Sequence, residues 1–234
     1  MEQSQRLLKD YSDQEKGAYI SAIASIATAD RSASPEEIQF LETLATSAEL
    51  SPQQRSNVQR AATEVAGEEL KTNLDLLKTS ELRYALLTDL VAFAESDNHY
   101  SDEEKAGIQK MAQYLGINQE QVSTINQFVQ KTSTANVTAQ QVQQPGFLSS
   151  LGLEDKFRKA GLDMGSLTKG LLGMQGPMIL ADLVRRGFSG NKSTTATGVT
   201  QGGERPGGFG SLISTITGGK GLKSAGSLLG KLFK

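Results

Sequence analysis

The sequence of 234 residues contains no cysteine and a single histidine, His99. The lack of cysteine excludes disulfide bonds, thiolate metal ligands and a cysteine nucleophile, and it suits a reducing compartment. The usual tetrahedral zinc sites also lack their ligands. The longest apolar runs are a few residues long, so neither a signal peptide nor a membrane-spanning segment of about 20 apolar residues is evident. We expect a cytoplasmic protein.

Sequence motifs of the common enzyme classes are missing as well. The chain has no Gly-x-Ser-x-Gly nucleophile elbow. Gly218-Gly219-Lys220 is not a phosphate-binding loop, because it lacks the following Ser/Thr and the earlier spaced glycine. A Ser-His-Asp triad would have to use His99, and no persuasive triad can be built on this one histidine. We therefore predict that the protein is not an enzyme, with no catalytic residue and no organic cofactor.

Charge and glycine are unevenly distributed along a chain whose formal net charge is −2. Residues 1–144 contain 12 Lys+Arg and 21 Asp+Glu, net −9, whereas residues 145–234 contain 12 and 5, net +7. Glycine occurs 4 times in the first region and 20 times in the second. This composition predicts a folded acidic region and a Gly-rich basic region with a polar linker between them.

Apolar residues of the acidic region recur at three- and four-residue spacing, which is typical of buried helix faces. A stripe from Gly17 to Ala29 precedes Ser34-Pro35-Glu36-Glu37, which has the capping serine and third-position glutamate of a helix start. A similar stripe, Leu86 to Ala94, precedes Ser101-Asp102-Glu103-Glu104, 67 residues later. That offset pairs Ile20 with Leu87, Ile23 with Leu90, Ala27 with Ala94, Asp30 with Asp97, Ser34 with Ser101, Glu37 with Glu104, Leu41 with Ile108 and Leu50 with Ile117. It indicates an internal duplication.

The predicted fold class is all-α. We expect a compact bundle of six or seven helices from two helix-loop-helix repeats, followed by a Gly-rich, partly disordered basic tail. The expected segments are a duplicated helical domain (1–131), a polar linker (132–146), a Gly-rich apolar segment with a short helix near 178–186 (147–188), a flexible linker (189–208) and a basic amphipathic C-terminal segment (209–234).

Four carboxylates of the repeats are candidates for a metal site: Asp30 and Asp97 in the loops, and Glu37 and Glu104 at the helix starts. Ca²⁺ and Mg²⁺ prefer oxygen ligands of this kind. A structural interpretation also accounts for these acids, because an acid at the third helical position is stabilised by the helix N-terminus by roughly 0.3–1 kcal/mol. A loop aspartate can likewise bond its own backbone.

Two further interpretations of this region are weaker. His99 lies in the second loop, where it would ligate a metal or carry a proton, or simply be exposed. A metal-dependent hydrolase using Asp97 and Glu104 is a remote alternative for which the sequence suggests no substrate.

The pattern of both copies resembles the TerB family of tellurite-resistance proteins, including the related N-terminal domain of a membrane-anchored DnaJ-like co-chaperone. An apolar helix ends in Ala-x-x-Asp, and Ser-x-x-Glu then opens a helix that reaches Leu-Gly-Ile. The resemblance covers about residues 15–130 and is best in the second copy, at Phe93–Asp97 and Tyr114–Ile117. It implies a role in tellurite and envelope stress.

The same resemblance implies that the acidic cluster proposed to chelate metal in TerB falls on Asp30, Glu37, Asp97 and Glu104. The glycine that the family has after each loop aspartate is Arg31 in the first copy and Asn98 in the second. Asn tolerates the left-handed conformation, whereas Arg adds a positive charge. We therefore expect any metal site to depend mainly on the second copy.

The C-terminal segment 209–234 contains Lys220, Lys223, Lys231 and Lys234 and no acid, with leucines and isoleucines between them. This pattern resembles peptides that lie on anionic membranes. Docking on its own acidic bundle or on a neighbouring subunit is also electrostatically favourable, and disorder is the third option. Nucleic-acid binding is not expected, since the basic residues are scattered and the acidic region repels phosphate.

These features together predict a TerB-like stress-response interaction or sensor module. We expect it to bind a protein partner or to self-associate, with a divalent cation (Ca²⁺ or Mg²⁺) as its one cofactor, and to reach the inner face of the membrane through its tail. The alternative is a structural subunit of a larger assembly, such as a phage particle, that uses the Gly-rich tail for subunit contacts.

Overall fold

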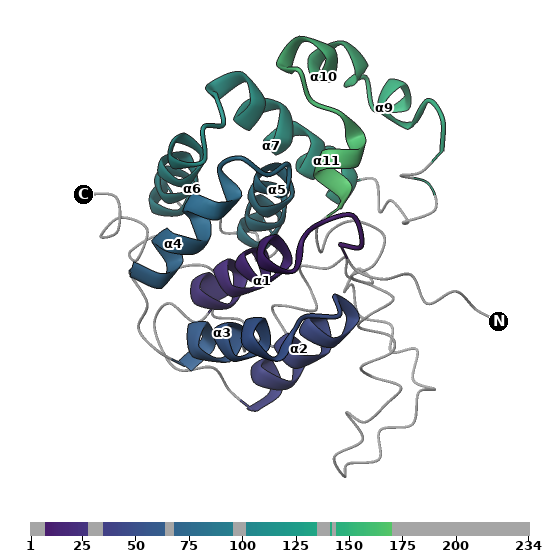
Figure 1. Cartoon of the computed structure of the whole chain (residues 1–234). Helices are drawn as coiled ribbons and strands as arrows, with labels where there is room; N and C mark the ends of the chain where they lie inside the picture. The colour runs from purple at the N-terminus through teal and green to yellow at the C-terminus, as the bar shows by residue number, and fades with distance from the viewer. Residues whose placement is uncertain are drawn as a thin grey trace, which may run out of the picture.

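The computed structural model of the chain describes residues 8–27, 35–63, 68–95, 102–134, 141 and 144–169. All regular secondary structure in these ranges is α-helical (Figure 1), as the sequence predicts. The helices are α1 (Asp13–Ala27), α2 (Pro35–Ser47), α3 (Pro52–Thr63), α4 (Glu68–Leu77), α5 (Leu82–Glu95), α6 (Asp102–Tyr114), α7 (Gln119–Thr134), α9 (Phe147–Ser150), α10 (Glu154–Ala160) and α11 (Met164–Thr168). None of them is both long and apolar enough to cross a membrane.

The predicted helix near 178–186, the linker 189–208 and the segment 209–234 lie outside the described residues. The limits of the five segments expected from composition therefore stay predictions.

Capping residues decide where the first helices begin. The helix α2 begins at Pro35, as predicted, and α3 begins at Pro52, because the fixed φ of proline suits the first helical position. The helix α1 begins earlier than the apolar stripe from Gly17 suggests. Its start is a capping box: Ser12 N–H donates to Glu15 Oε2 at 3.0 Å, and Glu15 N–H donates to Ser12 Oγ at 3.3 Å.

The predicted duplication is confirmed by the helix boundaries and by their hydrogen bonds. The helices α6 and α7 begin 67 residues after α2 and α3. The ends of α2 and α6 repeat the same backbone bond, from Leu50 N–H to the Ala45 carbonyl at 2.9 Å and from Ile117 N–H to the Ala112 carbonyl at 2.8 Å. The fold is therefore two copies of a three-helix unit, α1–α3 and α5–α7, with α4 between them.

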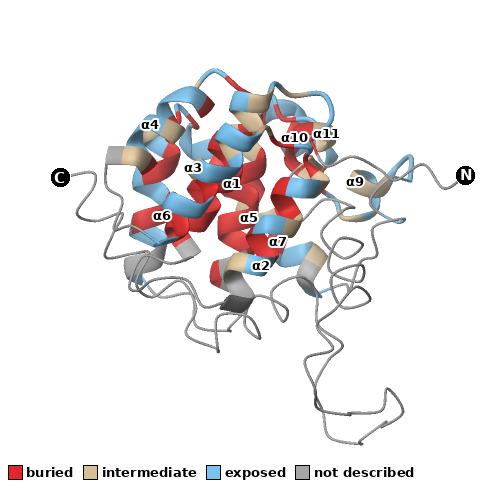
Figure 2. Ribbon diagram, turned by 60° about the horizontal axis from the view of Figure 1, so that its bottom comes forward, coloured by how far each residue is buried: buried red, intermediate tan, exposed pale blue. Residues whose placement is uncertain are grey.

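The core is built around α5, which contacts α1, α4, α6, α7 and α11. Every residue of this helix from Ala85 to Val91 is 0 % exposed. A helix that is apolar around its whole circumference has to lie inside the molecule, and each fully buried leucine contributes about 1.5–3 kcal/mol. Figure 2 shows the buried residues concentrated along α1, α5 and α7.

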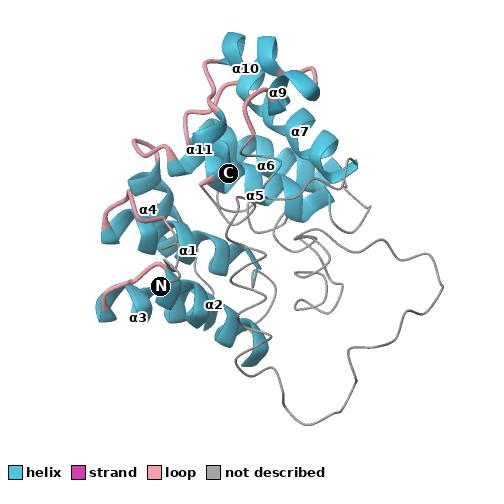
Figure 3. Ribbon diagram, turned by 90° about the vertical axis from the view of Figure 1, so that its right-hand side faces the viewer, coloured by secondary structure: helices cyan, strands magenta, loops and turns pink. Residues whose placement is uncertain are grey.

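The helices that follow the second unit extend the same core. Leu153, Phe157 and Leu167 are at most 2 % exposed and belong to one apolar cluster with α5 and α7. Phe157 meets Phe128 of α7 edge to face, with ring centroids 5.7 Å apart. Figures 1 and 3 place α9 and α10 beside α7, at the opposite end of the molecule from α2 and α3.

The two units differ where their first and third helices meet. Gly17 of α1 lies against Gln54 of α3, so closely that an added Cβ would come within 3.0 Å of Gln54 Cβ. The equivalent pair in the second unit is Tyr84 and Gln121, and here Gln121 Nε2 donates to the Tyr84 hydroxyl at 3.3 Å and to the Ala160 carbonyl at 3.2 Å. One unit therefore uses a glycine for close helix packing, and the other uses a polar contact that also holds α10.

The second residue after the end of α2 and of α6 is left-handed in both units, with φ 52° at Glu49 and 72° at Gly116. Glycine adopts this conformation without strain, whereas other residues do not. We expect Glu49→Gly to raise the free energy of unfolding by roughly 0.5–1 kcal/mol and Gly116→Ala to lower it by about 1 kcal/mol, measured by urea denaturation. As a control, Ser47→Gly at the last residue of α2 should be destabilising, because Ser47 is still helical. Equal losses of stability for Ser47→Gly and Glu49→Gly would contradict the assignment.

Candidate functional site

Two of the four predicted metal ligands, Glu37 and Glu104, lie at equivalent places in the two units. Glu37 and Glu104 are the third residues of α2 and α6, so the backbone position that the sequence predicts is confirmed for both. Their side chains, and the loop residues Asp30 and Asp97, lie outside the described residues. The proposed ligand set therefore stays a prediction, and so does any role of His99, which lies in the same second loop.

Within the described ranges, no group of three or more Asp, Glu or His side chains is arranged to hold a metal ion. Asp102 and Glu15, two of the described acids, are engaged in local contacts. Asp102 at the start of α6 pairs with Lys105 at 3.2 Å, and hydrogen bonds from Ser80 and then Ser12 lower the pKa of Glu15. The prediction of a cation site therefore rests on the two loops and on the acids at the starts of α2 and α6 that follow them.

A buried polar pair joins the two units. The hydroxyl of Tyr19 in α1 donates to Oδ2 of Asp89 in α5, and both residues are 0 % exposed. A carboxyl group buried in this way needs hydrogen-bond donors, because it has lost its contact with water. Complete burial also keeps Asp89 away from any substrate, so the pair acts within the structure.

Sequence reasoning missed this pair. Tyr19 is expected to be an apolar residue of the α1 stripe, and Asp89 is not singled out. A signal was present, because Asp89 is the only charged residue between Arg83 and Glu95, in a helix that is apolar on every side.

An exposed polar cluster connects α4 with α6. Asp75 accepts a hydrogen bond from the Tyr114 hydroxyl at 2.6 Å and pairs with Lys78 at 2.8 Å. The Lys78 ammonium also lies 3.6 Å from the centre of the Tyr114 ring. Lys78 and then Tyr114 lower the pKa of Asp75, as expected for an acid that accepts charged and polar hydrogen bonds. Such exposed contacts contribute little to stability.

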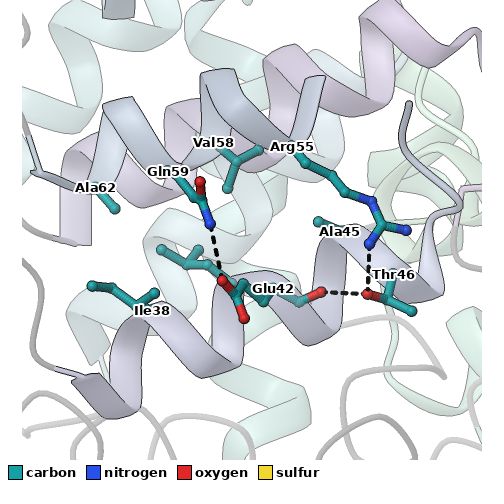
Figure 4. A pocket seen from close by; sticks show the side chains of 9 residues that line it. Ile38, Glu42, Ala45, Thr46, Arg55, Val58, Gln59 and Ala62 are labelled. Carbon is teal, nitrogen blue, oxygen red and sulfur yellow. Dashed lines mark hydrogen bonds between the residues drawn. The ribbon is translucent and has the colours of Figure 1, made fainter. Parts of the chain in front are cut away.

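A groove of about 290 Å³ lies between α2 and α3. Its floor is apolar and its rim is polar (Figure 4). The lining residues are Ile38, Leu41, Glu42, Ala45, Thr46, Arg55, Val58, Gln59 and Ala62. Two hydrogen bonds cross the rim, from Gln59 Nε2 to Glu42 Oε1 at 2.9 Å and from Arg55 to Thr46 Oγ1 at 3.3 Å. This chemistry suits apolar side chains of a partner segment.

The described helices define a class of protein: an all-α domain built from two copies of a three-helix unit. Residues 16–127 match the family described as tellurite resistance protein TerB, so this part of the chain is a TerB-family domain. The resemblance seen in the sequence over about residues 15–130 is therefore confirmed. No curated protein and no solved structure shows significant similarity to the chain.

The buried pair can be tested by removing one hydroxyl. Tyr19→Phe should lower the free energy of unfolding by about 1–3 kcal/mol, because Asp89 loses a buried donor. Tyr114→Phe removes a hydroxyl that bonds the exposed Asp75 and should leave stability nearly unchanged. Denaturant unfolding of both variants compares their free energies of unfolding. Equal losses of stability would show that burial of the hydrogen bond between Tyr19 and Asp89 is unimportant.

Proposed function

We propose that the chain is a non-enzymatic interaction and sensor module that acts in the stress response. The TerB-family domain at residues 16–127 is the observation that carries the proposal. The groove between α2 and α3 supports it, because its lining includes no histidine, cysteine or serine and has a single carboxylate, Glu42. An apolar floor with a polar rim is suited to binding a partner rather than to transforming a substrate.

We further propose that Asp30, Glu37, Asp97 and Glu104 bind a divalent cation, Ca²⁺ or Mg²⁺. Two features support this. The equivalent start of α2 and α6 gives each unit an acid at the same helical position, and residues 1–144 carry a net charge of −9 that a cation would partly neutralise. The positive charge of Arg31 opposes a cation in the first loop, so Asp97 and Glu104 of the second copy contribute most to cation binding.

Calorimetric titration of the full chain with Ca²⁺, Mg²⁺ and Mn²⁺ tests the cation site. We expect micromolar binding of at least one ion, lost in Asp97→Asn/Glu104→Gln because both charged ligands are removed. Asp102→Asn is the matched control, since Asp102 neighbours Glu104 in α6, is exposed and pairs with Lys105. An absence of heat with all three ions would reduce the four acids to helix caps and loop residues.

The C-terminal segment 209–234 would attach the module to an anionic membrane surface or to a partner. Its four lysines, lack of acids and recurring leucines support this role.

Cosedimentation with vesicles containing phosphatidylserine tests the attachment. Each lysine near an anionic surface is worth about 1 kcal/mol, so Lys231→Gln/Lys234→Gln should weaken binding roughly 10- to 30-fold. The control Lys110→Gln/Lys159→Gln removes two exposed lysines of α6 and α10 and should have little effect. Equal losses of vesicle binding in both variants would show that binding depends on the overall charge of the protein and not on the C-terminal segment. Large discrete oligomers without lipid would instead favour a structural subunit.

A further inference from the structure

We draw no further inference here: the strongest candidate, the apolar groove between α2 and α3, has both Glu42 and Arg55 among its lining residues, and nothing in the described part of the structure shows what covers it.

Discussion

The complete burial of α5 is the constraint on which the other helices depend. This helix is apolar on all sides, so it needs neighbours around its whole circumference, and α1, α4, α6, α7 and α11 provide them. The one acid in its interior, Asp89, adds a directional requirement to a contact that is otherwise purely apolar. Tyr19 meets this requirement and so fixes how α1 lies against α5. Apolar packing alone tolerates shifts that a buried hydrogen bond does not.

Most of the fold could be predicted from the sequence because its signals are local. Proline at the first helical position and a regular 3.6-residue pattern mark α2 and α3, and a constant offset of 67 residues reveals the second copy. The start of α1 was missed because its capping box, Ser12 and Glu15, precedes the apolar stripe. The left-handed end of α2 was missed because Glu49 occupies a position where its counterpart is glycine.

The site could be predicted less well, for two physical reasons. The four acids are visible in the sequence, but their geometry depends on loops that no periodic pattern constrains, and the structure does not describe these loops. The groove is lined by residues of two helices, among them Leu41 of α2 and Val58 and Ala62 of α3. Such a groove forms only when the two helices pack together, so it cannot be seen in either helix alone.

The link between Tyr19 and Asp89 makes each unit depend on the other. Its donor comes from the first unit and its acceptor from the second, and the equivalent residues in the other unit, Leu86 and Ala22, are apolar. Neither unit therefore contains both partners of this buried contact, which exists only where the two units are joined in one domain.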